Sequence, residues 1–458
     1  MTTNYLHGVE VEEMPGGVSI STVDSSTIGL IGTLLYTNNP PGEEDKGNKG
    51  GQPTETIKTG DNQSVESVTQ FSEPLPENNA LDPFAEPYLV TSLKGFFAHF
   101  NKNGQTISGT LASALCDIYS QVAAKVVVAP MKSASDLDKG IALIEKASEK
   151  LKEDPKILVA PELTDSKTGV SNSAQQLTAN TAIDVKMLTE KLVKSAEKLK
   201  AVALVDLIAT NNTLTDITTA LTGLTSSSRL YLLYPNVKVK RKSAQTIANI
   251  SSAPSTAGSN DKETELERPA SAFVAGLLVK SDAERGFWCS PSNYKLSNIN
   301  GLAQEVAFTL GDTTCLANQL NEKYINTIIW HDGYRLWGNR SYTPKAGEDQ
   351  RFQFLSVRRV ADVINMSLLK NHMWAIDQNI TKNLKDTLVD SANGFIRKLR
   401  LQGAIINGKC WADEEKNTEE SLAAGRFYIS FDFTAPYPAE RITFQSYLTK
   451  DYLKEVLA

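Results

Sequence analysis

Few residue pairs in the sequence have the types and spacing that catalysis requires. His331 and Asp332 follow an apolar run and are the most plausible acid–base pair of the chain. Neighbouring residues face opposite sides of a strand, and polar neighbours on a turn usually stabilise the turn. Ser292 lies in Ser290-Pro-Ser292, without the flanking glycines of a nucleophile elbow. We therefore expect no active site at either place and predict that the chain is not an enzyme.

Metal and cofactor motifs are also missing from the sequence. The histidines form no HxxxH or HExxH pair, and Cys116, Cys289, Cys315 and Cys410 form no CxxC pair. Neither a GxxxxGK[ST] loop nor a GxGxxG turn is present. We expect no cofactor and no bound metal. The charged group Asp282, Glu284 and Arg285 is interpreted as stabilising a turn rather than as a pair of catalytic carboxylates.

Composition and charge describe a globular chain of several domains. Its 458 residues exceed one ordinary core, which predicts two to four domains. The formal net charge of -6 argues against a general affinity for nucleic acid or for an anionic membrane. No apolar run reaches the ~20 residues that span a bilayer, and the first residues lack a signal-peptide pattern. We therefore expect folding in a cytoplasm and no membrane insertion.

The middle of the chain alternates strand-like apolar runs with helix-like apolar stripes. This alternation favours an α/β fold with a mostly parallel sheet and helices packed on it. Polar stretches at 37–87 and 243–264 interrupt the pattern and are expected to be loops or insertions. Strands are expected at 26–36, 125–129, 157–160, 201–208 and 230–234, and helices at 92–100, 110–122, 136–150, 173–199 and 269–279.

The last third carries further helix and strand patterns. Residues 354–376 are expected to form a strand that passes into a helix. Residues 384–401 show the apolar stripe of an amphipathic helix, and Gly403 is placed to end it. The run from 427 to 433 alternates apolar with polar residues, which predicts a strand with one buried face. A second strand is expected at 441–447.

Two of the strand patterns, at 9–12 and 441–447, stand near the ends of the chain without an obvious partner. Unpaired strands expose N–H and C=O groups, which pairing with another subunit satisfies. We predict that both segments complete the sheet of a neighbouring subunit, in which the resident strand is 427–433. The residues assigned to this exchange are Val9, Glu10, Val11, Glu12, Phe427, Ile429, Phe431, Ile442 and Phe444.

Three segments of the last third follow one another in a characteristic order. They are Asp282-Ala-Glu-Arg-Gly-Phe-Trp-Cys-Ser-Pro-Ser-Asn293, Gly333-Tyr-Arg-Leu-Trp-Gly-Asn-Arg340 and Phe354-Leu-Ser-Val-Arg-Arg-Val-Ala-Asp362. In this order the chain resembles the contractile tail sheath family of phage tails and related injection machines. The segments 5–17, 121–128, 229–235 and 320–329 agree with the resemblance, which covers roughly 1–36 and 88–458. Residues 37–87 show no resemblance.

The resemblance implies a structural subunit that stacks as hexameric rings around an inner tube and contracts to drive the tube through a target envelope. The implied partners are further copies of the chain, the inner tail tube protein, and baseplate and tail terminator proteins, without nucleic acid. Assembly in the cytoplasm of a bacterial host and a place in the virion tail, or in a contractile injection particle, are also implied.

The resemblance further implies that the helix at 384–401 faces the inner tube. Its basic residues would then meet acidic residues of the tube protein. The alternative is that they only complement the dipole of the helix at its C-terminal end. The residues concerned are Lys382, Lys385, Arg397, Lys398 and Arg400.

These patterns suggest an order of domains along the chain. An extended arm at 1–20 precedes a strand at 21–36 of the inner or core domain and a polar insertion at 37–87. An outer α/β part at 88–330 follows, then an inner α+β C-terminal domain at 331–437 and an arm at 438–458. Two other interpretations stay open: a soluble α/β enzyme with a Rossmann-like sheet, and a baseplate or adaptor component of the same machine.

Overall fold

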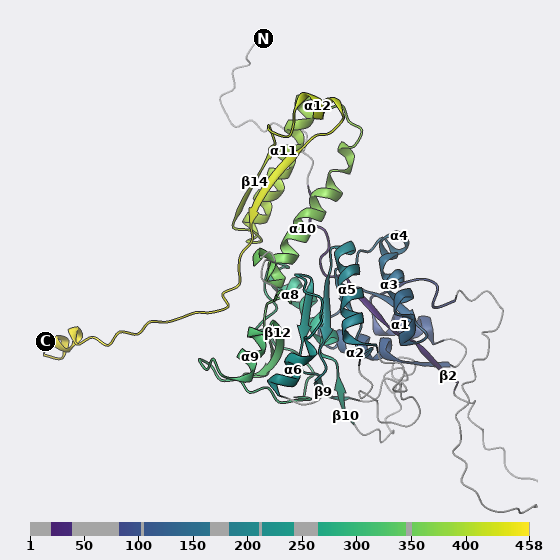
Figure 1. Cartoon of the computed structure of the whole chain (residues 1–458), viewed down its shortest axis with the longest axis vertical. Coiled ribbons are helices and arrows are strands. Elements are labelled where there is room, and N and C mark those ends of the chain that lie inside the picture. Colours follow the sequence, from purple (N-terminus) through teal and green to yellow (C-terminus); the bar gives the residue numbers. More distant parts are fainter. Residues whose placement is uncertain are drawn as a thin grey trace, which may run out of the picture.

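The computed structural model of the chain shows an α/β body from which a smaller stalk projects (Figure 1). It describes residues 20–38, 82–101, 105–164, 183–209, 213–241, 264–344 and 350–457. The stalk is formed by α10, α11, α12 and a β-hairpin, and the described elements before α10 belong to the body. Residues 436–457 form an extended segment, which we call the C-terminal arm; it contacts the body as far as Glu440 and then runs away from both parts.

Eight strands form the central sheet of the body, in the order β13-β12-β8-β7-β6-β1-β5-β3. The strands from β12 to β5 are parallel to their neighbours, and β13 and β3 are antiparallel at the edges. The predicted, mostly parallel sheet is therefore confirmed. The strands are β1 (Ile28–Thr33), β3 (Tyr88–Val90), β5 (Val126–Met131), β6 (Ile157–Val159), β7 (Val202–Asp206), β8 (Leu230–Leu233), β12 (Ile325–Trp330) and β13 (Tyr334–Trp337).

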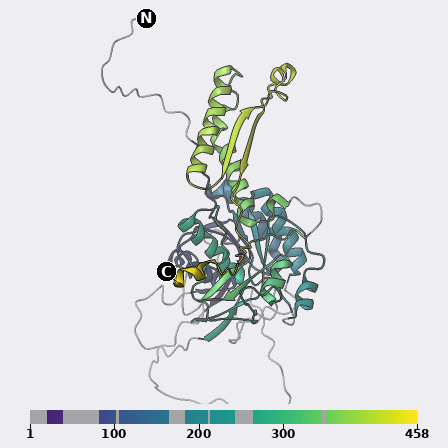
Figure 2. The ribbon, with the colours of Figure 1, turned by 90° about the vertical axis from the view of Figure 1, so that its left-hand side faces the viewer.

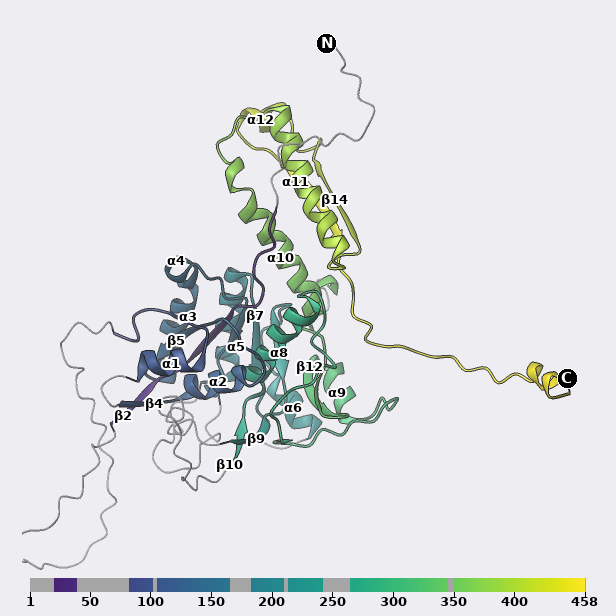
Figure 3. The ribbon, with the colours of Figure 1, turned by 180° about the vertical axis from the view of Figure 1, so that it is seen from behind.

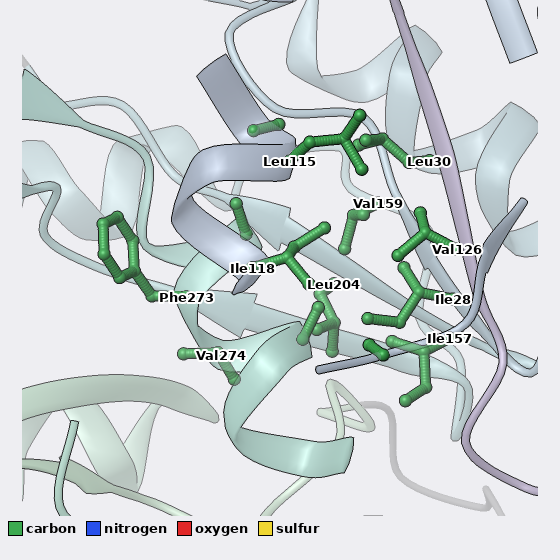
Figure 4. Close-up of a cluster of buried hydrophobic side chains, with 14 of the residues drawn as sticks. Ile28, Leu30, Leu115, Ile118, Val126, Ile157, Val159, Leu204, Phe273 and Val274 are labelled. Atoms are coloured by element: carbon green, nitrogen blue, oxygen red, sulfur yellow. The ribbon is translucent and has the colours of Figure 1, made fainter. Parts of the chain in front are cut away.

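Helices cover both faces of this sheet, because successive residues of a buried strand point to opposite sides. Val126 and Val128 belong to the core beneath α1, α2 and α8, whereas Val127 and Ala129 belong to the core beneath α3 and α5. Figure 4 shows part of the first core, where Ile118 of α2 lies among strand residues. The helices are α1 (Leu93–Phe100), α2 (Thr110–Tyr119), α3 (Leu137–Glu145), α4 (Ala147–Leu151), α5 (Val185–Leu199), α6 (Leu214–Ala220), α8 (Ala270–Arg285) and α9 (Leu316–Glu322).

Several predicted elements of the body have different bounds in the structure. The helix expected at 136–150 is split into α3 and α4 at Lys146, whose N–H contacts the carbonyls of both Ala142 and Leu143. In the helix expected at 173–199, the described part is α5, which begins after Asp184 because that side chain accepts a hydrogen bond from the N–H of Lys186. Residues 165–182 lie outside the described ranges, as do most of 37–87 and 243–264.

Two smaller sheets flank the main one. β9 (Val237–Arg241) lies between β10 (Thr264–Arg268) and β11 (Gly301–Leu302), and both pair with it in antiparallel fashion. β2 (Leu35–Asn38) pairs with β4 (Gln105–Ser108), so the apolar run predicted as one strand at 26–36 contains β1 and the start of β2.

Two antiparallel helices and a β-hairpin make up the stalk (Figure 2). α10 (Leu355–Asn371) leads away from the body, and α11 (Lys382–Leu401) returns beside it. β14 (Asn407–Ala412) and β15 (Ile429–Thr434) pair in antiparallel fashion, and α12 (Glu419–Ala423) lies in the loop between them. The strand predicted at 427–433 is confirmed as β15, and the helix predicted at 384–401 as α11.

The start of α10 and the end of α11 show how the local sequence determines where a helix begins and ends. The strand expected before α10 was wrong, because Phe354 forms a single bridge with Arg340 and the helix starts at the next residue. α11 ends at Leu401, and Gly403, predicted to cap the helix, follows with a φ of 79°, a conformation that suits glycine. The N–H of Ala404 there donates to the carbonyl of Leu399, which closes the last turn.

Candidate inter-subunit interface

One edge of the stalk hairpin is covered in its middle by the neighbouring helix. Asn393 of α11 accepts a hydrogen bond from the N–H of Cys410 in β14 and donates one to the carbonyl of Cys410, both at 2.9 Å. These two backbone groups are those that a further strand beside β14 would need. The side chain of Asn393 therefore occupies the middle of the β14 edge.

The opposite edge of the hairpin, along β15, is open. β14 is the only described strand that pairs with β15. Cys410 stands opposite Phe431 in the ladder. In an antiparallel pair, the N–H and C=O groups of two opposite residues either both point towards the partner strand or both point away from it. Since the groups of Cys410 point away from β15, those of Phe431 point away from β14, as do those of Ile429 and Phe433 two positions along. The β15 edge can accept a third strand.

The side chains of β15 give this open edge an apolar face. Ile429, Phe431 and Phe433 are partly buried against the core of the stalk. The rings of Phe431 and Phe433 are stacked, with their centroids 6.3 Å apart. A strand added beside β15 would place every second side chain next to this row. An alternation of apolar residues in the added strand would therefore extend the stalk core.

The C-terminal arm carries such an alternation and does not bury it within its own chain. Ile442 is 69% exposed and Phe444 is 91% exposed. In the described part of the chain, residues 441–457 form no hydrogen bond with the body or the stalk, and Figure 3 shows the arm running away from the hairpin. Large apolar side chains exposed on an extended segment indicate a contact with another molecule.

The residues predicted for strand exchange thus fall into three groups. Ile429 and Phe431 lie in β15, whereas Phe427 lies two residues before that strand and is partly exposed. Ile442 and Phe444 lie in the arm, and the structure does not bring them to β15 of the same chain. Val9, Glu10, Val11 and Glu12 lie outside the described residues.

The five basic residues predicted to meet the inner tube lie at the two ends of α11. In the first turns, Lys385 lies 3.3 Å from the carboxylate of Asp386, and Lys382 is exposed. The acidic Asp390 follows in the middle of the helix. The basic groups without an acidic neighbour on the next turn are those of the last two turns: Arg397, Lys398 and Arg400, all exposed.

A buried ion pair joins the stalk to the body. Arg359, near the start of α10, and Asp282, in the last turn of α8, have side chains only 4% and 5% exposed. One Arg359 nitrogen donates to Asp282 at 2.8 Å, and the other contacts the second carboxylate oxygen and donates to the carbonyl of Ser25 at 3.1 Å. The hydroxyl of Ser26 also donates to Asp282. Asp282 therefore connects two parts of the molecule, and our interpretation of it as part of a turn was wrong.

Further charged contacts surround this joint. Asp362, one turn along α10, accepts hydrogen bonds from Arg229 of the body at 2.6 and 2.8 Å and from Arg358 at 2.7 Å. At the far end of α10, the exposed side chain of Lys370 pairs with Asp154. The cavity between these elements has a volume of about 20 Å³, which is enough for a water molecule. At the centre of the joint, Arg359 is paired with Asp282, and Arg229 and Arg358 are both paired with Asp362.

The carboxyl ends of the parallel strands, where α/β enzymes bind their ligands, hold side chains of the chain itself. Asp206, at the end of β7, accepts hydrogen bonds from the N–H and the hydroxyl of Ser271 at the start of α8. Glu162, just after β6, contacts Arg268, which also donates to Asp117 at 2.8 Å. Burial alone would lower the pKa of Arg268, but these two carboxylates raise it above its usual value.

The remaining candidate features of the described residues are metal ligands, membrane-spanning helices and the His331–Asp332 pair. Among them, no group of three or more His, Cys, Asp or Glu side chains is arranged to hold a metal ion. No helix within the described ranges is long and apolar enough to cross a bilayer. His331 and Asp332 lie in the tight connection between β12 and β13, where Asp332 has a φ of 53° and pairs with Lys295 at 2.8 Å. Their predicted role in a turn is confirmed.

Comparison with known proteins identifies relatives over most of the chain. Residues 144–342 match the phage tail sheath protein central domain, and residues 347–449 match the phage tail sheath C-terminal domain. A prophage major tail sheath protein of Pseudomonas aeruginosa (strain UCBPP-PA14) is 33% identical over 389 residues, which are 81% of this chain and 88% of that protein. The tail sheath protein of Burkholderia phage BcepMu is 37% identical over 233 residues, which are 50% of this chain and 44% of that protein.

A solved structure shares the fold of the whole chain. The helical sheath of the anti-feeding prophage in its contracted state, determined by cryo-electron microscopy, matches with a TM-score of 0.61. The match covers 98% of this chain and 100% of that one, at 18% sequence identity. At this identity the likeness concerns the fold alone.

Proposed function

The chain belongs to the phage tail sheath family and is a structural subunit of a contractile sheath, and we propose that it polymerises by strand exchange at the stalk hairpin. In this proposal, residues 441–447 of one subunit pair with the open edge of β15 in a neighbour. The observation that carries the proposal is the open β15 edge together with an arm whose Ile442 and Phe444 are exposed. A cross-link between the arm of one subunit and the β15 strand of another, in an assembled sheath, is the direct test.

The covered β14 edge restricts how two donated strands can be arranged. Because Asn393 occupies the middle of that edge, we infer that only β15 accepts a strand directly. If both terminal segments take part, the second pairs with the first, in the order β14, β15, first donor, second donor. The segment Val9–Glu12 is the other candidate donor, since its apolar residues alternate in the same way.

We further propose that the subunits stack as hexameric rings around an inner tube, and that baseplate and tail terminator proteins bound the stack. Membership of the family supports this arrangement, and assembly in the cytoplasm of a bacterial host goes with it. Contraction then requires an interface with two stable arrangements rather than a bound nucleotide. We assign no catalytic role to the chain. The family membership does not favour the two other interpretations, a Rossmann-like enzyme and a baseplate or adaptor component.

The basic end of α11 is our candidate for attachment to the inner tube. Changing Arg397→Glu and Lys398→Glu together is expected to reduce co-purification of sheath and tube at least ~10-fold, because like charges across an interface repel. The fold should not change, since both side chains are exposed. The measurement is pull-down of the tube protein with assembled sheath.

A matched control reverses two charges elsewhere on the stalk, Lys416→Glu and Arg426→Glu, both exposed near α12. This control should retain tube binding. If the α11 variant also binds the tube as the wild type does, the basic residues serve only the helix end and the attachment proposal is wrong.

A further inference from the structure

An ion pair holds the root of the C-terminal arm on the body. Arg340 donates from Nε to one carboxylate oxygen of Glu440 at 2.8 Å and from Nη2 to the other. The two side chains are 31% and 37% exposed. The hydrogen bonds and the charge of Glu440 raise the pKa of Arg340 above its usual value. This two-pronged geometry fixes direction as well as distance.

The backbone of Arg340 is fixed firmly in the body. The carbonyl of Arg340 accepts a hydrogen bond from the side chain of Asn326 in β12 at 3.0 Å, and the backbone of Arg340 forms the β-bridge with Phe354. Its guanidinium lies 5.8 Å from the ring centre of Phe354 and 5.9 Å from that of Tyr324. Arg340 is therefore a rigid point of attachment for the arm.

Glu440 is the last arm residue with such a contact in the described part of the chain. Before it, Ala435 is buried at the end of the hairpin, and the ring of Tyr437 lies 6.0 Å from that of Phe354. After it, residues 441–449 are all exposed. The direction in which the remaining arm leaves the molecule is thus set at the Arg340–Glu440 pair.

The same geometry exposes the chain to a competing reaction within one subunit. β15 ends at Thr434, and the predicted donor strand begins at Arg441, so only residues 435–440 separate the acceptor edge from the donor. This connection is only slightly longer than the ~2–5 residues usual for a β-hairpin loop, so it is short enough to allow pairing within the chain. A short connection gives residues 441–447 a high effective concentration at the β15 edge of their own chain, which favours pairing within the chain. Such pairing would occupy the edge to which a neighbouring subunit's strand is proposed to bind.

We propose that the Arg340–Glu440 pair is a latch that keeps the arm off its own β15 edge and directs residues 441–457 towards a neighbouring subunit. Arg340 is then a positioning residue for polymerisation. This inference rests on the proposed strand exchange. It explains why an arginine of the α/β body, far from the hairpin in sequence, contacts an arm that leaves the stalk.

The latch can be tested by measuring where the arm lies in the dilute monomer. Spin labels at Arg426→Cys, just before β15, and at Leu448→Cys, in the arm, report the distance between hairpin and arm. Cys289→Ser removes the partly exposed thiol. Cys116, Cys315 and Cys410 are buried, and burial raises the pKa of the Cys410 thiol to about 11, so these thiols should not react at neutral pH.

With Arg340 and Glu440 unchanged, the labels at positions 426 and 448 should lie only at long distances from each other, because the arm runs away from the hairpin. Glu440→Gln should produce a second, short-distance population and slow sheath formation roughly five-fold, as expected for loss of a partly exposed ion pair. The double variant Arg340→Glu with Glu440→Arg should restore the long distances and most of the assembly rate. Glu455→Gln removes the same charge from the same arm and should change neither reading.

The latch is wrong if Glu440→Gln shows no short-distance population, or if the charge-swapped double variant behaves like the single variant. Failure of the strand exchange itself looks different. In that case subunits that lack residues 441–458 assemble into normal sheaths, whatever the distances in the monomer.

Discussion

Removing residues 441–458 is expected to leave a folded subunit that cannot form a sheath. The fold should survive because residues 441–449 are exposed and form no hydrogen bond with the described body or stalk. Assembly should fail because the β15 edge of each neighbour stays unpaired. Sedimentation and negative-stain electron microscopy measure polymer formation, and circular dichroism measures the fold.

A pair of substitutions makes the same test without shortening the chain. Ile442→Ser with Phe444→Ser removes two apolar side chains that assembly would bury, a loss of about 3–6 kcal/mol. This corresponds to a rise of roughly 100-fold or more in the concentration needed for assembly. Thr443→Ala with Gln445→Ala changes the opposite face of the same segment and serves as the control. Equal losses in the two variants, or no loss in the first, would contradict strand pairing through this face.

Replacing Arg359 by methionine is expected to lower the free energy of unfolding by about 3–5 kcal/mol. The substitution leaves the carboxylate of Asp282 buried without its cation, and only serine hydroxyls remain as its partners. Urea unfolding of the monomer, followed by circular dichroism, gives the free energy. The joint matters for the proposed polymer because it fixes the stalk, which carries the β15 edge, to the body.

Two further variants separate the buried pair from the general effect of charge. Lys370→Met removes a more exposed ion pair between α10 and the body and is expected to cost no more than about 1 kcal/mol. Arg359→Met combined with Asp282→Leu removes both buried charges and should recover most of the loss. A double variant as unstable as Arg359→Met alone would show that the cost comes from packing rather than from the unpaired charge.

The sequence predicted those parts of the fold in which burial repeats at short intervals. The parallel sheet follows from apolar runs such as the one that forms β5. α11 follows from apolar residues three or four positions apart, and β15 follows from apolar residues two positions apart. The exposed alternation at 441–447 is visible in the same way, although in the isolated subunit this segment pairs with nothing in the described chain.

Other features depend on contacts between distant residues, which periodicity does not reveal. β14 has the sequence Asn407-Gly-Lys-Cys-Trp-Ala412, which lacks a clear alternation, and its outer edge is covered by an asparagine of α11. The sequence predicts a local turn around Asp282, but the partner of Asp282 is Arg359 on another helix. The Arg340–Glu440 latch joins residues a hundred positions apart. Only the folded structure brings such groups together.

The most direct measurement of strand exchange is a cross-link in a sheath assembled from two kinds of subunit. One half of the subunits is labelled with ¹⁵N, and a photoreactive phenylalanine analogue replaces Phe444 in all of them. After irradiation, mass spectrometry identifies the peptides joined to the arm. We expect cross-links to Ile429–Thr434 that include pairs of one labelled and one unlabelled peptide. Cross-links to this strand only between peptides of the same isotope, or none to it at all, would contradict exchange between subunits.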